Sequence, residues 1–341
     1  MNFLRSIPPW LGHSIRIGLG IAVIYGLIRT GALNPDLLWE AVKHHPMDYG
    51  LAFFLYLGIL EALAYLRWLW LLRVARVSIS AWEVLRLHLI GLFFSGFLPG
   101  GTGGDLVKGY FLLRGRSKKE GAAALGTMVV DRITGTFGLI LLGAITNFMN
   151  ISMWRDSRVL ATQTIFVLSL AAVTVLLIGL FLSLWRPPQE GAHVLDETKP
   201  VLGFLKEFLT DVVAFRDAPK VFMGAIGISM LVQVCLVGVY ALCAQALDVS
   251  LPFKLHAYVV PTLTLLNGIP ISIAGLGIGE EGGKFLYHAL GVVHRGSDIP
   301  ALVHSIVFLT TFVCAPVYLF SRWNEKLPPE IKPADKNSNA A

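Results

Sequence analysis

Apolar runs long enough to cross a membrane recur along the whole chain. A transmembrane helix needs about 20 mostly apolar residues, and 55% of the 341 residues are hydrophobic whereas only 15% are charged. The runs of this length cover residues 15–33, 50–71, 121–148, 160–185, 221–247 and 300–320. They predict an all-α polytopic membrane protein with about six full spans, and no soluble stretch is long enough to hold a core of its own.

Two further apolar segments, residues 87–107 and 257–291, are broken by proline and by clustered glycines. Basic residues flank the first segment on both sides, and Lys and Arg near membrane segments mark the cytoplasmic side. Those before it are Arg67, Arg73, Arg76 and Arg86, and those on and after its exit are Lys108, Arg114, Arg116, Lys118 and Lys119. Because this segment is too short to cross twice, we expect a re-entrant helical hairpin near residues 87–112, and a second one near residues 257–291.

The two halves of the chain show the same order of segments in opposite orientation. Residues 1–150 give span, span, hairpin and span, and residues 151–341 repeat this order before a short cytoplasmic tail. The bias of Lys and Arg to one side predicts a multi-pass protein of the cytoplasmic (inner) membrane with both termini in the cytoplasm. Inverted repeats whose broken helices meet near the midplane are typical of transporters.

Each hairpin carries glycines at its tip, followed by an acid and a lysine. The tip residues are Pro99, Gly100, Gly101, Gly103 and Gly104 in the first hairpin, and Pro270, Gly275 and Gly277 in the second. The charged residues that follow the tips or fall inside spans are Asp105, Lys108, Glu280, Glu281, Lys284, Asp131, Arg132 and Glu61. A charge at the centre of a lone span costs roughly 2.5–3.5 kcal/mol. We therefore expect these side chains to face one interior cavity, pair acid with base, and bind substrate.

Structural roles compete with binding at the hairpins. Asp105 with Lys108, and Glu280 with Lys284, have the i,i+3 and i,i+4 spacing of local ion pairs on one helix. The acids could also cap the N-termini of the returning half-helices. The sequence leaves these alternatives open.

Within the spans, Asp131 and Arg132 are adjacent and point about 100° apart on a helix. They cannot satisfy each other well, which favours Arg132 as a ligand. Glu61 fits a structural role as well as a binding role. His88 is expected to be an interhelical hydrogen-bond partner.

The chemistry of such a cavity favours a lipid headgroup. Backbone amides at the tips, the positive ends of half-helices and Arg132 all suit an anionic group such as phosphate. A polar cavity at mid-depth fits a phospholipid or isoprenoid phosphate whose tail stays in the bilayer. The glycine-rich tips lack the lysine-serine ending and the preceding strand of a P-loop, and the three cysteines have no metal-ligand spacing. We expect no catalytic residue, no metal, no cofactor and no nucleic-acid partner.

Three stretches of this sequence resemble signatures of a known family. They are residues 93–105 (FFSGFLPGGTGGD), the pair Asp131-Arg132, and residues 270–277 (PISIAGLG) followed by Glu280. The family is the flippase-like transmembrane domain of lysylphosphatidylglycerol synthases, the UPF0104-type membrane proteins. The resemblance implies a translocase for an anionic or aminoacylated phospholipid, or an isoprenoid phosphate.

The resemblance also implies which residues bind that lipid, namely Asp105, Lys108, Asp131, Arg132 and Glu280. The family commonly has arginine at the position of Lys108, and often arginine at the position of Gly279. Two-part members carry a cytosolic aminoacyl-transferase domain after the membrane domain, and we expect no such domain here.

Two other functions remain open at this stage. One is a membrane-embedded transferase or hydrolase acting on a lipid-linked phosphate, with the acids as general bases or metal ligands. The other is an ion-coupled or proton-coupled transporter of a small solute. The sequence is also compatible with a homodimer.

Overall fold

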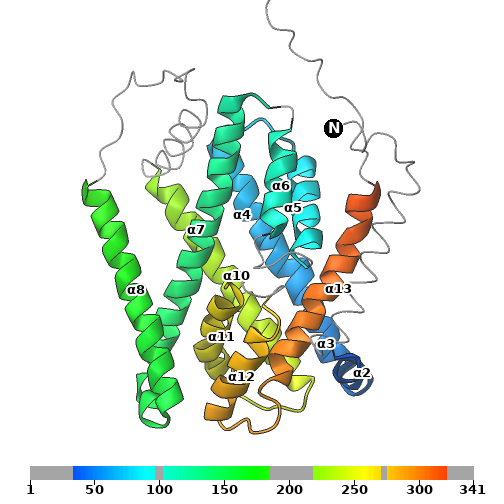
Figure 1. Cartoon of the computed structure of the whole chain (residues 1–341), viewed down its shortest axis with the longest axis vertical. Helices are drawn as coiled ribbons and strands as arrows, with labels where there is room; N and C mark the ends of the chain where they lie inside the picture. The colour runs from blue at the N-terminus through cyan, green and yellow to red at the C-terminus, as the bar shows by residue number, and fades with distance from the viewer. Residues whose placement is uncertain (1–33, 97–102, 115, 185–217, 270–274, 321–341) are drawn as a thin grey trace, which may run out of the picture.

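The computed structural model describes residues 34–96, 103–114, 116–184, 218–269 and 275–320, and every regular element among them is a helix (Figure 1). Five candidate membrane spans are long and apolar enough to cross a membrane. They are Pro46–Val74, Glu120–Met149, Arg158–Leu177, Pro219–Gln245 and Asp298–Phe320. They confirm the predicted all-α polytopic fold and coincide with five of the predicted spans. The predicted span at residues 15–33 lies outside the described residues.

The first candidate span is built from three consecutive elements. These are α3 (Pro46–Phe53), the π-helical segment η2 (Phe54–Leu60) and α4 (Glu61–Val74). The wider π-helical turns end where Glu61 begins α4, and π-helical turns inside α-helices are frequent at functional sites. A short helix, α2 (Pro35–His44), precedes the span, and the Asn34 side chain caps its N-terminus.

The first hairpin consists of α5 (Ala81–Ser95) and α6 (Gly103–Leu113), which pack side by side in the upper half of the molecule (Figure 1). The first arm begins earlier than predicted because the Ser80 hydroxyl caps α5, accepting the backbone N–H of Glu83 at 3.1 Å. The arm therefore has 15 residues, about 22 Å of helix at about 1.5 Å per residue.

Glycines bring the two arms of this hairpin close together. A Cβ atom at Gly104 would collide with the backbone carbonyl of Gly91 on α5, so only glycine permits this approach. Gly103 and Gly104 form the first turn of α6, whereas the predicted tip residues Pro99, Gly100 and Gly101 lie outside the described residues.

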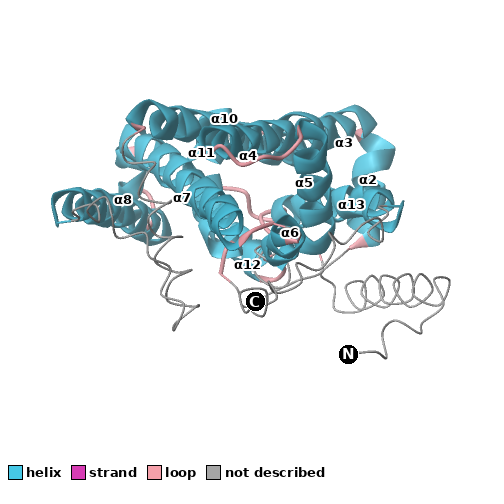
Figure 2. Ribbon diagram, turned by 90° about the horizontal axis from the view of Figure 1, so that it is seen from above, coloured by secondary structure: helices cyan, strands magenta, loops and turns pink. Residues whose placement is uncertain are grey.

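Three long helices follow, namely α7 (Lys118–Met149), α8 (Arg158–Leu184) after the short 3₁₀ helix η3 (Ile151–Arg155), and α10 (Pro219–Gln245). A capping box between Ser117 and Glu120 fixes the start of α7. Seen from above, α8 lies at the outside next to α7, whereas α10 packs against α4, α7 and α11 (Figure 2).

The second hairpin consists of α11 (Phe253–Asn267) and α12 (Ile278–Ala289), and α13 (Asp298–Phe320) follows it. The predicted tip glycines Gly275 and Gly277 both have positive φ, +86° and +83°, a left-handed conformation that favours glycine. The predicted tip residue Pro270 lies outside the described residues.

The two hairpins occupy opposite halves of the molecule, and α13 packs against an arm of each (Figure 1). The helix order of residues 151–341 matches the expected span, span, hairpin and span. The first predicted span of residues 1–150 lies outside the described residues. Re-entry of the hairpins into a membrane and the inverted repeat therefore stay predictions.

Candidate functional site

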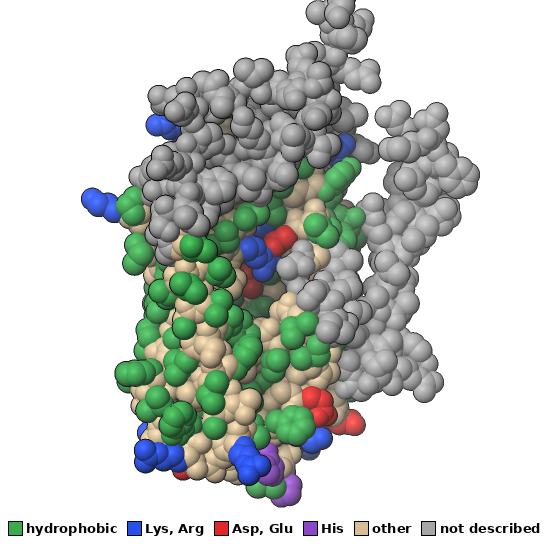
Figure 3. Space-filling model, turned by 60° about the vertical axis from the view of Figure 1, so that its left-hand side comes forward, with side chains coloured by type: hydrophobic (Ala, Val, Ile, Leu, Met, Phe, Trp, Pro, Cys, Tyr) green, Lys and Arg blue, Asp and Glu red, His purple; other side chains and the backbone are tan. Residues whose placement is uncertain are grey.

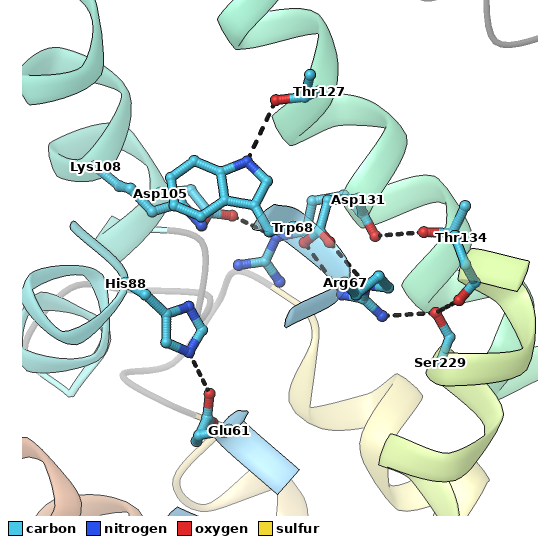
Figure 4. Close-up of polar contacts among 12 residues, drawn as sticks. Glu61, Arg67, Trp68, His88, Asp105, Lys108, Thr127, Asp131, Thr134 and Ser229 are labelled. Carbon is cyan, nitrogen blue, oxygen red and sulfur yellow. Dashed lines mark hydrogen bonds and ion pairs between the residues drawn. The ribbon is translucent and has the colours of Figure 1, made fainter. Parts of the chain in front are cut away.

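A buried ion pair between α4 and α7 forms the base of the candidate site. Arg67 donates from Nε to Asp131 Oδ1 at 2.7 Å and from one terminal amino group to Asp131 Oδ2 at 3.1 Å. Its other terminal amino group donates to the Ser229 hydroxyl of α10 at 2.6 Å (Figure 4). Every edge of this guanidinium is therefore engaged. The bidentate pair joins α4 to α7, and the bond to Ser229 adds α10.

The position of Arg67 corrects the sequence prediction. It was grouped with the basic residues that flank the first hairpin on the cytoplasmic side, but it is buried within the candidate span Pro46–Val74. Arg67 was grouped with flanking residues because it stands only a few residues from the end of an apolar run, and the side of the membrane on which these residues lie stays a prediction. A basic residue inside such a run is itself a sign of a functional or paired site.

The next residue on α7 forms a second and more open cluster. Arg132 points away from Asp131, as predicted, and its Nε donates to Oδ2 of Asp105 at the start of α6. Lys108, one turn later on α6, places its Nζ atom 3.5 Å from Oδ1 of the same carboxylate. Asp105 thus lies between two basic side chains contributed by two helices.

An aromatic side chain supports Lys108 from α4. The Lys108 ammonium lies 3.9 Å from the centre of the Trp68 ring, a cation–π contact. The Trp68 Nε1–H donates to the Thr127 hydroxyl of α7 at 3.3 Å, which fixes the ring plane (Figure 4). Because Lys108 and Trp68 are both buried, the ammonium has little freedom to leave this position.

The second cluster opens to the surroundings at Arg132, whereas Lys108 and the Arg67 pair are buried. The Arg132 side chain is 55% exposed. Figure 3 shows basic and acidic side chains side by side in a recess of a face whose middle part is otherwise hydrophobic or uncharged. Within the described residues, the hydrogen bonds of Arg132 use Nε alone. Its two terminal amino groups are therefore available to a ligand that enters the recess.

Glu61 and His88 form a third pair beside these clusters. The His88 Nε2 atom lies 3.0 Å from Glu61 Oε2, which joins α4 to the first hairpin and confirms His88 as an interhelical partner (Figure 4). Both side chains are mostly buried.

The predicted residues of the second hairpin form a separate group in the lower half of the molecule. The local Glu280–Lys284 pair considered from the sequence is wrong. Glu280 accepts the backbone N–H of Gly277 at 2.6 Å, which caps α12, and its other oxygen lies 2.7 Å from Nδ1 of His304 on α13. His304 was missed because it is a lone histidine within an apolar helix, 24 positions away.

Glu281 and Lys284 do not share an interior cavity with the other charges. They pair with each other at 3.5 Å on α12, with side chains 62% and 60% exposed. The prediction of one cavity for all eight charged residues is therefore wrong for these two, and for Glu280, which pairs with His304 instead. Among the described residues, no three His, Cys, Asp or Glu side chains gather into a group that could hold a metal ion.

Gly279, one of the two departures from the family pattern, has no space for a side chain. A Cβ atom there would lie 2.5 Å from Asn267 Oδ1 and 2.9 Å from His304 Cε1. The arginine expected from the resemblance would require both neighbours to move. With glycine at position 279, the partner of Glu280 is His304.

Comparison with known proteins identifies a family across most of the chain. Residues 15–315 match the family described as the lysylphosphatidylglycerol synthase TM region. A relative named "UPF0104 membrane protein", from Methanothermobacter thermautotrophicus, is 22% identical over 335 residues, covering 90% of this chain and 97% of its own. No solved structure matches. The predicted family is thereby confirmed.

Proposed function

Because the chain belongs to the family of the lysylphosphatidylglycerol synthase TM region, we propose that it moves a phospholipid or polyprenyl-phosphate-type lipid across the cytoplasmic membrane. The headgroup binds in the recess at Asp105, Lys108 and Arg132. The acyl or isoprenoid chains stay in the bilayer. These side chains bind and release the lipid without making or breaking a covalent bond.

The proposal rests on the guanidinium of Arg132, which among the described residues is hydrogen-bonded through Nε alone. A fully satisfied arginine, such as Arg67, cannot accept a ligand without losing protein contacts. Arg132 keeps both terminal amino groups available while Asp105 holds its Nε. Two parallel N–H donors match the geometry of a phosphate group, which arginine binds bidentately.

The charge balance around the recess favours an anionic headgroup. The basic side chains Arg67, Lys108 and Arg132 face the two carboxylates of Asp105 and Asp131. One positive charge is left in excess, and a phosphate would neutralise it. The carboxylate of Glu61 is held separately, in a contact with His88 at 3.0 Å.

The arrangement of the hairpins supports movement of the lipid and not only its binding. Two helical hairpins lie in opposite halves of the molecule, and α13 packs against both (Figure 1). Transporters with broken helices place their substrate site where such elements meet. Rocking of one half against the other would expose the recess to the two leaflets in turn.

Reconstitution with a lipid carrying a fluorophore on its acyl chain tests the proposal. The full chain is placed in liposomes, and a membrane-impermeant reductant quenches only the lipids in the outer leaflet. We expect lipid movement with wild type, and its loss in Arg132→Ala. Lys284→Ala, which removes an exposed basic residue of α12, is the matched control and should keep the wild-type rate. Wild-type movement by Arg132→Ala would overturn the proposal.

The same assay identifies the headgroup. Phosphatidylglycerol, phosphatidylethanolamine and a polyprenyl phosphate, each carrying the same fluorophore, are compared at equal density. A phosphate-directed site should move lipids whose phosphate is accessible and should fail with a neutral glycolipid, which has a polar sugar headgroup but no phosphate. Equal movement of the glycolipid would show that the charged recess does not select the cargo.

A further inference from the structure

Among the described residues, the ion-pair partner of Glu280 on the second hairpin is a histidine, His304. Asp105 and Asp131 each contact lysine or arginine, whose positive charge is permanent at neutral pH. Glu280 instead contacts Nδ1 of His304 at 2.7 Å. Across the described ranges, no lysine or arginine forms an ion pair with Glu280. The net charge of this pair therefore depends on whether it holds a proton.

The pair is closed off from its surroundings on the histidine side. The His304 side chain is only 3% exposed, and among the described residues its buried Nε2 atom has no hydrogen-bond partner. Asn267 Oδ1, which like the imidazole lies near the position that a Cβ atom of Gly279 would take, is a second such atom within the described ranges. Buried polar atoms that remain unpaired mark strain or an unfilled role.

The surrounding groups offer no other counter-charge. Other titratable side chains on the packed helices are uncharged, like the Tyr240 hydroxyl on α10, or have partners of their own. Tyr49 on α3 is bonded to Ser305, and His256 on α11 is bonded to Tyr287 on α12. His88 on α5 is bonded to Glu61, and Glu40 on α2 is bonded to Arg295. The exposed Glu281 and Lys284 pair with each other. Among the described residues of α8, the one charged side chain is Arg158 at its first position.

We propose that Glu280 and His304 form a proton-binding site that couples the second hairpin to pH. With one proton shared between Glu280 Oε1 and His304 Nδ1, the pair is neutral overall and the start of α12 stays packed against α13. When the proton leaves, a buried carboxylate remains without a counter-charge, which is costly in a low-dielectric site. The contact between α12 and α13 is then weakened. The role of this change in lipid movement rests on the proposed function above.

Nuclear magnetic resonance of the full chain with ¹⁵N-labelled histidine tests the proton site directly. The signal of His304 is assigned by its absence in His304→Gln, and the protein in nanodiscs is titrated over the range of about pH 5 to 8 in which histidines change charge. Glu280→Gln should shift the His304 titration to lower pH, because it removes the carboxylate that favours the protonated imidazole. Tyr287→Phe, which removes the hydroxyl partner of the buried His256, should leave the His304 titration unchanged.

Two outcomes of this titration would overturn the site. One is a His304 signal that does not titrate in wild type, and the other is an identical titration in wild type and Glu280→Gln. Because no lipid is needed, the result is independent of whether the protein moves lipid. Size-exclusion profiles of each variant confirm that it is folded, and His304→Asn serves as a second variant if His304→Gln aggregates.

Transport under an imposed pH gradient then tests the coupling. Wild type should change its rate of lipid movement when the gradient is applied, and His304→Gln should lose that response. His256→Gln, a change of another buried histidine in the same half, should keep it. An unchanged pH response in His304→Gln would overturn the coupling. If no variant moves lipid while His304 still responds to Glu280→Gln, the proposed function fails but the proton site stands.

Discussion

Consecutive residues of α7 take part in two arginine–aspartate pairs with different properties. Asp131 receives two hydrogen bonds from Arg67, whose remaining amino group is also engaged, and this pair is buried. Arg132 gives one hydrogen bond to Asp105 and remains more than half exposed. The first pair is complete without a ligand, whereas in the second, among the described residues, Arg132 forms a hydrogen bond through Nε alone.

On one turn of α7, this difference predicts that one pair contributes to the stability of the fold and the other to the proposed lipid movement. Breaking a buried and fully hydrogen-bonded pair leaves a charge without compensation, which destabilises the fold. Breaking an exposed pair costs little stability, because water replaces the lost partner. We therefore expect variants of the Arg67–Asp131 pair to act on folding and variants of the Arg132–Asp105 pair to act on lipid movement.

The largest expected effect is on the free energy of unfolding of Asp131→Ala. The variant leaves Arg67 buried without its counter-charge, and removal of one partner of such a pair costs about 3–5 kcal/mol. Denaturant titration in mixed micelles measures this loss. Replacing both partners, as Arg67→Met with Asp131→Leu, should restore part of the stability. A loss below about 1 kcal/mol in Asp131→Ala would show that the pair behaves as an exposed one.

Arg132→Ala should show the opposite pattern. Its unfolding free energy should fall by about 1 kcal/mol or less, whereas the rate of lipid movement should fall about 10- to 100-fold through loss of a charge-assisted contact to phosphate. Arg132→Lys should lie between the two, because it keeps the charge but not the forked donors. If Arg132→Ala unfolds easily and the folded fraction moves lipid normally, the two pairs have been assigned the wrong roles.

A smaller effect is expected for Lys108→Met, which keeps the aliphatic stem but removes the ammonium. The ammonium contacts both Asp105 and the Trp68 ring, and its loss should lower the rate of lipid movement about 10-fold. Lys108→Arg restores the charge and should recover most of the rate. A full rate in Lys108→Met would mean that Arg132 alone holds the headgroup.

Much of the fold could be predicted, because apolar length determines which segments can span a membrane. Pairing inside the membrane could be predicted only in part. Because Asp131 and Arg132 are adjacent, the sequence predicted that each pairs with another residue. It did not identify Arg67 as the partner of Asp131, because Arg67 is close to the end of an apolar run and resembles a flanking residue. The partner of Glu280 could not be found by spacing, because His304 reaches it from another helix.

The smallest effect is expected where the sequence predicted a shared cavity and the structure shows an exposed pair. Glu281 and Lys284 lie 3.5 Å apart with most of their side chains accessible, and such pairs contribute about 0–1 kcal/mol. Glu281→Gln and Lys284→Ala should therefore leave both unfolding and lipid movement near wild type. A large loss of lipid movement in either variant would indicate that this part of α12 contacts a second protein chain, as at a homodimer interface. Measuring the mass of the wild-type and variant proteins in nanodiscs would distinguish that contact from a direct role in the recess.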